Sequence, residues 1–370
     1  MKLKKGFLRS LIILVNIGVI VGYVITCLIP FINTSKYWFL AFPGLIFPLV
    51  LAALIGFIIL WLLLKSRWWI VNFIILLLGY QQIAAVFAFN LPGDFTEERK
   101  PNTLRVFQWN ASNWAAENTG PNKPHASKSE MFELIGAKNA DVLCVQEYYE
   151  NYTPDGYEEN IKLIYDLGYK YHYFVPTVSY PNDFKSGIAI FSKYPIIDSA
   201  QYAFRADDRS EHLIYADIKV EDKVFRVFST HLQSVKFVES DYRSLSRIRH
   251  AEKPDLRGSK KIVYKLRSGY VSRYNETELV SEKLRESPYP AIICGDFNDV
   301  PNSRTYFRIR GDMTDAFIKK GWGIGRTFLF ISPTLRIDYI FADKRFEVDQ
   351  FQIIDVPYSA HYPLVTDLLY

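Results

Sequence analysis

Long apolar runs fill the N-terminal part of the chain, whereas the remainder alternates between short apolar runs and polar segments. The long runs cover residues 11–30, 37–64 and 68–89, and none of them contains a charged residue or a histidine. A helix that crosses a bilayer needs ~20 such residues. The pattern predicts three transmembrane helices, and the second must tilt or kink near Pro43 or Pro48 because it is longer than the bilayer requires.

Basic residues orient these predicted helices. Residues 1–89 contain seven basic residues and no acidic one. Four of the seven precede the first run, and Lys65 and Arg67 separate the second from the third, so the positive-inside tendency places both groups in the cytoplasm. Lys36 is the one basic residue against this orientation. Three crossings predict a multi-pass protein of the inner membrane, with the N-terminus cytoplasmic and everything after residue 90 periplasmic.

The net charge of the whole chain differs from that of the residues after position 89. The formal net charge is +5, but seven of the 44 Lys and Arg residues lie in the apolar part, which leaves 37 against 39 Asp and Glu, a net charge of −2. The basic balance is therefore no evidence that the polar part binds nucleic acid. Three Cys are too few for a disulfide framework and are expected to be buried thiols.

A linker is expected at residues 90–103, and a single domain at residues 104–370. Strands are predicted at 104–109, 141–146, 187–191, 213–220, 224–229, 291–294 and 335–341, with a closing strand inside 359–370. Helices are predicted at 129–138 and 158–167, and a long helical stretch after residue 231 is broken near Pro254. Strands mixed with helices, including one hairpin, predict a mixed-sheet α/β sandwich.

Polar residues recur where the predicted strands end. Asp296 and Asn298 follow the apolar run 290–294, and side chains two apart on extended backbone share a face. Such a pair can serve as base and stabiliser for attack on a phosphate. The other polar residues at strand ends or in late segments are Asn110, Glu147, His231, Asp338 and His361. Strand ends of a sheet converge on one crevice, which favours a shared site.

Each of these residues also has a structural interpretation when it is taken singly. Asn110 could end a turn, Glu147 could be a solvated acid, and Asp338 could lie at an exposed strand edge. Lone polar residues of this kind are structural more often than catalytic, by roughly 3:1. Their joint occurrence reverses those odds.

Seven segments in order resemble the endonuclease/exonuclease/phosphatase superfamily, which includes pancreatic deoxyribonuclease, apurinic endonucleases, neutral sphingomyelinases and inositol polyphosphate 5-phosphatases. The segments are Gln108-Trp109-Asn110, Val145-Gln146-Glu147, residues 186–192, Thr230-His231-Leu232, Gly295-Asp296-Phe297-Asn298, Arg336-Ile337-Asp338-Tyr339 and Ser359-Ala360-His361-Tyr362-Pro363. The resemblance spans nearly all of residues 104–370. It implies a four-layered α/β sandwich and metal-dependent hydrolysis of phosphate esters.

The resemblance also implies a role for each residue. Glu147 would be the ligand for Mg²⁺, with Mn²⁺ as an alternative, and Asn110 would support the metal or the phosphate. Asp296 would orient or deprotonate the attacking water, and Asn298 would donate to a phosphate oxygen. His231 would contact the phosphate or the leaving group. Asp338 would hold the tautomer of His361, which would bind a phosphate oxygen.

One position departs from the family pattern. The residue before the last histidine is normally Asp, and here it is Ala360. Losing that carboxylate removes a negative charge near the metal and the phosphate, so reduced activity is expected. The alternatives are an introduced inactivating substitution and a natural variant with altered chemistry. The completeness of the other segments favours the former.

The substrate is less well determined by the sequence. Residues 236–273 carry eleven Lys and Arg against four Asp and Glu, which reads either as a basic flap over an anionic substrate or as a solvated helical face. Arg243, Arg247 and Arg326 are the candidate substrate-binding residues. A membrane-proximal lipid phosphate is favoured, and the alternatives are a nuclease for DNA or RNA and a non-catalytic membrane binding or assembly protein. Three predicted helices exceed what tethering needs, so a membrane protein partner is a further expectation.

Overall fold

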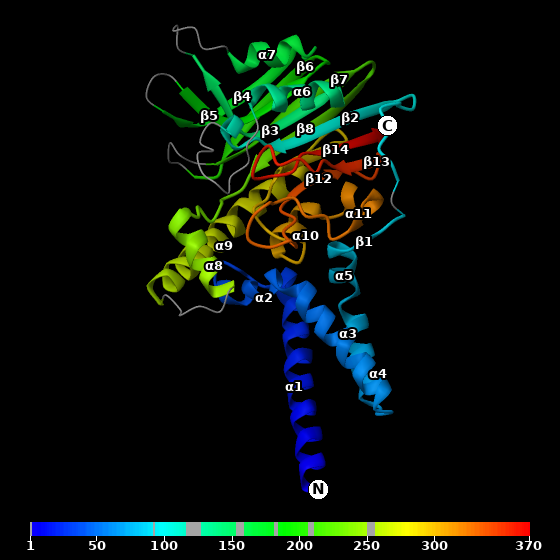
Figure 1. Ribbon diagram of the computed structural model, residues 1–370. Coiled ribbons are helices and arrows are strands. Elements are labelled where there is room, and N and C mark those ends of the chain that lie inside the picture. The colour runs from blue at the N-terminus through cyan, green and yellow to red at the C-terminus, as the bar shows by residue number, and fades with distance from the viewer. Residues whose placement is uncertain are drawn as a thin grey trace.

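Two six-stranded sheets packed face to face form the head of the molecule, and a helical stalk extends from it (Figure 1). The structure is a computed structural model that describes residues 2–91, 93–115, 127–152, 159–180, 184–205, 211–249 and 256–370. The break expected near Pro254 and the first residue of the helix expected at 158–167 lie outside these ranges.

In each of these sheets one pair of neighbouring strands is parallel, and all other neighbours are antiparallel. The first sheet runs β10 (Thr314–Asp315), β12 (Asp338–Ala342), β9 (Ala291–Asp296), β8 (Lys223–His231), β7 (His212–Val220) and β6 (Ile196–Ala203). The second runs β13 (Glu347–Ile353), β14 (Leu364–Leu369), β2 (Thr103–Asn110), β3 (Val142–Asn151), β5 (Phe184–Ser192) and β4 (Tyr171–Ser179). The parallel pairs are β8–β9 and β2–β3. The mixed sheets expected from the sequence are confirmed.

Helices cover the outer face of each sheet and complete four layers. Helices α6 (Lys128–Lys138) and α7 (Asn160–Asp166) pack on the second sheet through buried residues such as Phe132 and Ile164. Helices α9 (Leu256–Arg285) and α10 (Arg304–Arg310) pack on the first through Val280, Tyr306 and others. The inner faces of both sheets bury aliphatic side chains against each other. Burial of this apolar area drives the association of the layers, and the four-layered α/β sandwich is confirmed.

The stalk differs from the three transmembrane helices that the sequence predicted. Among the described residues, one helical segment is long and apolar enough by itself to cross a membrane: Gly6–Phe31, which consists of most of α1 (Lys2–Leu28) and of η1 (Ile29–Phe31). The second run forms η2 (Trp38–Ala41), α2 (Phe42–Leu45) and α3 (Phe47–Leu63), bent by 64°. The third forms α4 (Trp68–Leu78) and α5 (Tyr80–Val86), bent by 63°.

Proline and glycine explain the two bends. The first lies at Ile46, between Pro43 and Pro48, where the sequence predicted a kink and where missing backbone N–H groups interrupt the helix. The second lies at Gly79, where a Cβ would come within 2.0 Å of the Tyr23 hydroxyl of α1. The close approach of α1 therefore requires glycine at this position. Three continuous membrane-spanning helices are not confirmed.

Direct contacts join the stalk to the head. The guanidinium of Arg336 donates to the carbonyl of Ala85 in α5 at 2.7 Å, and Asn302 donates to the carbonyl of Thr26 in α1 at 3.1 Å. Strand β1 (Ala88–Phe89), which follows α5, pairs with β11 (Trp322–Gly323) of the head. Backbone carbonyls near helix ends need such donors, so the contacts satisfy groups that the helices leave open.

Candidate active site

The ends of neighbouring strands bring the predicted residues together. His231 ends β8 and Asp296 ends β9, and the parallel register places the two directly opposite each other. The antiparallel register of β9 with β12 then places Asp296 opposite Asp338. Asn110 ends β2 of the other sheet, where it pairs with Gln146 of β3. Because both sheets end at this edge, all of these side chains reach one crevice.

Asp296 lies at the centre of the site. Its Oδ2 lies 3.6 Å from Nε2 of His231 and 3.7 Å from Nε2 of His361, and it accepts a hydrogen bond from Asn110 at 3.1 Å. Its Oδ1 accepts the backbone N–H of Asn298 at 2.8 Å. Burial raises the pKa of Asp296 to about 6, although the two histidines lower it. The carboxylate is thus a base within reach of neutral pH.

Both histidines are held by a carboxylate on Nδ1. Nδ1 of His361 lies 2.9 Å from Oδ2 of Asp338, and Nδ1 of His231 lies 3.3 Å from Oε2 of Glu211. Burial lowers the pKa of each imidazole, but the neighbouring carboxylates outweigh it and raise the pKa of His231 to about 10 and that of His361 to about 9. Each Nε2 therefore points to Asp296 and carries a proton to offer.

Glu211 is the member of this arrangement that the sequence did not predict. It lies one residue before β7 and is buried enough that its pKa would rise, but His231 holds the pKa below its ordinary value. An acid before an apolar strand has no local signal that separates it from a solvated acid. Only the packing of β7 against β8 brings it to His231.

Two site residues have left-handed backbone. Glu147 has φ 48° and interrupts the register of β3 with β5 between Val145 and Tyr148, and Asn298 has φ 51°. A bulge of this kind re-aims a side chain, and non-glycine residues at positive φ concentrate at functional sites. The Glu147 carboxylate then lies 3.3 Å from the amide nitrogen of Asn110 and 3.9 Å from Nε2 of His231.

Gly295 allows the two strand ends to approach. A Cβ at this position would lie 2.1 Å from the carbonyl oxygen of Thr230, the residue paired with it across β8 and β9. Glycine is therefore required one residue before Asp296 and opposite the residue before His231.

The structure places the remaining predicted residues differently. Asn298 belongs to the site, but its side-chain amide donates to the carbonyl of Leu232 at 2.9 Å. Arg326 donates to the carbonyl of Phe328 at 2.7 Å and also to that of Leu329, so its guanidinium holds this loop. Arg243 and Arg247 are exposed on α8 (Glu239–Arg249), and no described contact joins them to the site. Ala360 is half-buried beside His361, and its carbonyl accepts the N–H of Leu329 at 2.9 Å.

The carboxylate and imidazole groups of the site could bind a hard divalent cation. Ligand atoms of Asp296, Asp338 and His361 lie within 4.8 Å of one another. However, both oxygens of Asp338 are engaged, one by His361 and the other by Gln108 at 3.3 Å. Glu147 has a side chain that is 36% exposed, so its carboxylate is the most open of the site's acidic groups. Asn110 lies between Glu147 and Asp296: its amide nitrogen donates to both carboxylates, and its oxygen accepts the N–H of Ser112 at 3.1 Å. Glu147, with Asp296 close by, is thus the better fit to a hard divalent cation.

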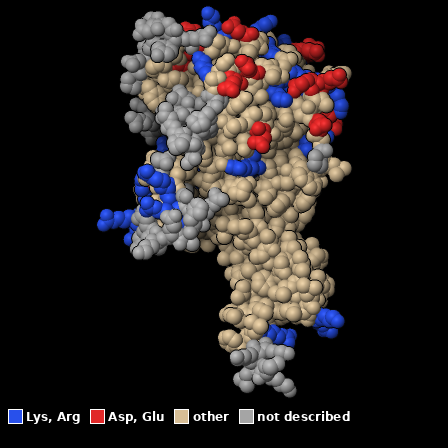
Figure 2. All heavy atoms as spheres, viewed as in Figure 1, with Lys and Arg blue, Asp and Glu red and all other residues tan. Residues whose placement is uncertain are grey.

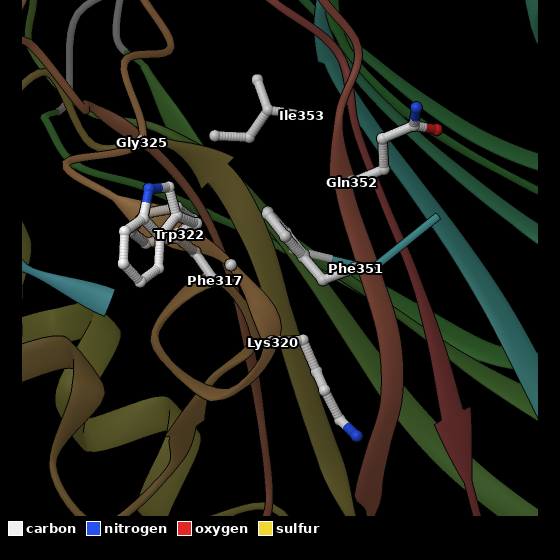
Figure 3. Close-up of a pocket in the computed structure, with 9 residues that line it drawn as sticks. Phe317, Lys320, Trp322, Gly325, Phe351, Gln352 and Ile353 are labelled. Carbon is white, nitrogen blue, oxygen red and sulfur yellow. The ribbon is translucent and has the colours of Figure 1, made fainter. Parts of the chain in front are cut away.

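The structure also contains a cavity that lies away from the candidate active site. A cavity of about 240 Å³ is lined by Phe317, Lys320, Trp322, Phe351 and neighbouring residues, none of them a member of the site (Figure 3). Apart from Lys320 and Gln352, its labelled side chains are apolar. The candidate active site is therefore defined by the convergence of its polar side chains and not by cavity volume.

Comparison with known proteins identifies relatives of both parts of the chain. The model of the endonuclease/exonuclease/phosphatase family matches residues 89–361, and that of a domain family of unknown function matches residues 9–86. A sphingomyelinase C of Bacillus cereus is 29% identical over 157 residues, which cover 38% of this chain and 46% of that protein. A second one is 30% identical over 129 residues, which cover 30% and 39%. The chain thus spans less than half the length of the curated relatives it matches.

Solved structures share the fold. An endonuclease/exonuclease/phosphatase from Beutenbergia cavernae superposes with a TM-score of 0.53 at 18% identity, covering 72% of each chain. A protein of the same description from Bacteroides vulgatus superposes with a TM-score of 0.51 at 18% identity, covering 72% of this chain and 98% of its own.

Proposed function

Since the chain belongs to the endonuclease/exonuclease/phosphatase family, we propose that it is a membrane-anchored phosphoesterase that hydrolyses a lipid phosphate ester with the help of a divalent cation. The observation that carries the proposal is the convergence of His231, Asp296 and His361, with carboxylates behind both imidazoles. A base between two proton-bearing imidazoles matches the needs of attack on a phosphate.

Each residue has a role in this proposal. Asp296 orients the attacking water and accepts its proton. His231 and His361 donate from Nε2 to phosphate oxygens or to the leaving oxygen, while Glu211 and Asp338 orient the two rings and stabilise their protonated form. A bound Mg²⁺ or Mn²⁺ would neutralise phosphate charge as a Lewis acid, and Glu147 with Asn110 would hold it. Asn298 supports Asp296 through its backbone N–H.

Two observations support a lipid as the substrate. The curated relatives are sphingomyelinases C, whose name specifies a lipid phosphodiester. The stalk is in direct contact with the head through Arg336 and Asn302, which holds the head next to the apolar helices. With the N-terminus cytoplasmic and an odd number of crossings, the head would lie in the periplasm against the inner membrane. The head's net charge of −2 disfavours the alternative, a nuclease acting on a duplex.

Ala360 limits the activity of the chain as written. The family's carboxylate is missing beside His361, so charge near the cation and the phosphate is reduced. The other members of the site are present, which is the arrangement of an enzyme weakened at one position. A protein that only binds or assembles would not need Asp338 and Glu211 behind the two imidazoles.

The substrate class is tested with the full chain and its Ala360→Asp variant in detergent with Mg²⁺. Each is given a mixed phospholipid extract or plasmid DNA, and products are identified by mass spectrometry. Release of a phosphorylated headgroup from lipid, with DNA intact, is the expected result. Cleavage of DNA with intact lipid would replace the lipid esterase by a nuclease, and inactivity on both would favour a binding role.

A further inference from the structure

A basic surface lies outside the candidate site, where the head meets the stalk. We call it the basic arm and define it as α8 together with residues 256–270 of α9. Figure 2 shows Lys and Arg side chains gathered over this region, beside the apolar stalk, and Figure 1 places α8 and α9 at the level of α2. The sequence left open whether residues 236–273 form a basic flap over an anionic substrate or a solvated helical face.

One face of α9 carries most of the charge. Residues 256–270 contain five basic side chains and no acidic one. The residues spaced three or four apart on the exposed face are Arg257, Lys260, Lys261, Tyr264 and Arg267. Tyr264 is 70% exposed, whereas Ile262 and Tyr270 on the opposite face are 5% and 3% exposed. The exposed face therefore combines positive charge with an aromatic ring, and the buried face holds the helix on the head.

A buried acid of α8 offsets part of this charge. Asp241 is engaged by Lys265 at 2.5 Å and Lys261 at 3.4 Å, and these two ion pairs fasten α8 to α9. Lys260 and Arg267 are exposed on the outer face of α9, and no ion pair joins them to an acid among the described residues.

The basic arm is continuous with the aromatic rim of the stalk. The guanidinium of Arg267 lies 5.7 Å from the ring centroid of Trp38, and Tyr270 packs edge-on against Phe42 at 5.8 Å. Phe39 in the same segment is 52% exposed. Tryptophan and other aromatic side chains favour the level of the lipid headgroups. The charged face of α9 thus begins where a bilayer around the stalk would end.

We propose that the basic arm docks on the anionic headgroups of the bilayer that holds the stalk. This inference rests on the membrane anchoring in the proposed function, and it assigns the basic arm to the membrane surface instead of to a flap over the substrate. Each Lys or Arg near such a surface strengthens the association roughly fivefold. Tyr264 and Val263, which are both exposed, would sit at the interface beside the charges.

Docking of the basic arm would also orient the active site. An aromatic series leads from α8 to the catalytic histidine: Tyr242 to Phe330 at 6.1 Å, Phe330 to Phe328 at 5.7 Å, and Phe328 to His361 at 4.9 Å between ring centroids. The loop that borders His361 is therefore packed against the basic arm. A membrane contact there would keep this edge of the site next to the lipid surface.

The test compares amide hydrogen exchange of the full chain in two kinds of nanodisc, phosphatidylcholine alone and phosphatidylcholine with phosphatidylglycerol. Residues 256–270 should exchange at least about fivefold more slowly with phosphatidylglycerol present. The difference should vanish at high salt, because the screening length falls from ~10 Å at 0.1 M to ~3 Å at 1 M. Equal exchange in both nanodiscs at low salt would overturn the proposal.

Two matched pairs of charge-reversing substitutions test whether the basic arm causes the slower exchange. Arg257→Glu with Lys260→Glu should abolish the protection, whereas Lys219→Glu with Lys223→Glu, two exposed lysines at the far end of β7 and β8, should keep it. Protection that survives the first pair would also overturn the proposal. Amides of α1 distinguish the two claims: slow exchange there in both nanodiscs supports anchoring by itself, and rapid exchange there would remove the anchoring and the docking together.

Discussion

At the scale of single residues, the chemistry depends on how two imidazoles are held. Asp338 and Glu211 each bind an Nδ1 and so direct an Nε2 to the carboxylate of Asp296. His231 ends β8 and His361 lies in the segment before β14, but a carboxylate on Nδ1 orients both rings. Loss of either carboxylate should leave the imidazole free to rotate and less readily protonated.

Asp338→Asn is therefore expected to lower kcat about 10–100-fold with little change in KM, because it acts on His361 and not on substrate binding. Asp367→Asn is the matched control. Asp367 is equally buried and pairs with Arg105 in the second sheet at 2.7 Å, away from the site. The control should lose thermal stability and keep its kcat. An Asp338→Asn variant with unchanged kcat would remove the positioning role.

Gly295→Ala should disrupt the site through the backbone. The added Cβ would meet the carbonyl of Thr230 at 2.1 Å, so β8 and β9 must separate where His231 and Asp296 pair. Activity should fall by at least about tenfold, with a stability loss of about 1–3 kcal/mol from overpacking. Gly311→Ala is the control, because Gly311 lies in a turn at φ 48° with open space around it, so the added Cβ strains the backbone but meets no atom. The activity of this variant should not change.

Most of this site could be predicted from the sequence, because its members follow apolar strands in a recognisable order. Asn110, His231 and Asp296 end strands as the pattern predicted, whereas Glu147 lies inside β3, at a break in its register with β5. Glu211 could not be predicted, since its partner is set by strand pairing. The sequence also could not show that the arginine at 326 is used by backbone carbonyls.

At the scale of elements, the strands that the pattern missed are those at sheet edges. Strands β4, β6 and β13 are outermost, and their residues are largely exposed or half-buried. An edge strand has no need for the continuous apolar run that marks a central one. In the stalk, the sequence predicted the apolar runs and a tilt or kink near Pro43 or Pro48, but not the bend of 63° in the third run.

A polar cluster inside the stalk offers a test of its helix packing. Asn16 of α1 donates to Asn72 of α4 at 2.7 Å and accepts from the indole of Trp61 of α3 at 2.7 Å. All three side chains are buried. Asn16→Leu should lower the unfolding free energy in detergent by about 1–3 kcal/mol, because the other two polar groups lose their partner. Val15→Leu, on an exposed face of α1, should change it by less than about 0.5 kcal/mol. Equal effects would mean that the cluster does not fasten the helices.

At the scale of the whole molecule, a buried ion pair of the head also contacts the stalk. Arg336 is 1% exposed, binds Asp315 at 2.7 Å and donates to the carbonyl of Ala85 in α5. It lies two residues before Asp338, so the contact with the stalk lies close in the chain to the group that holds His361. The family segment that contains Arg336 thus serves both the site and the junction.

Arg336→Met should destabilise the protein by about 3–5 kcal/mol, since it leaves the Asp315 carboxylate buried without its cationic partner. Arg345→Met is the control, because Arg345 pairs with Asp343 at 2.8 Å on the surface and should cost at most about 1 kcal/mol. Thermal unfolding of the full chain in detergent measures both. An Arg336→Met protein as stable as the control would show that the junction does not contribute to the stability of the fold.

The most direct test of the phosphoesterase site is the initial rate of lipid phosphodiester hydrolysis by Ala360→Asp, compared with the unaltered chain and with Ala360→Asp carrying Glu147→Gln. Restoring the family carboxylate should raise the rate about 10–100-fold in Mg²⁺, and removing the carboxylate that we propose to hold the cation should reduce the raised rate by about 10²–10³-fold. Chelation of the cation should match the Glu147→Gln result. Hydrolysis that is equally fast with and without Glu147 would contradict the proposed site.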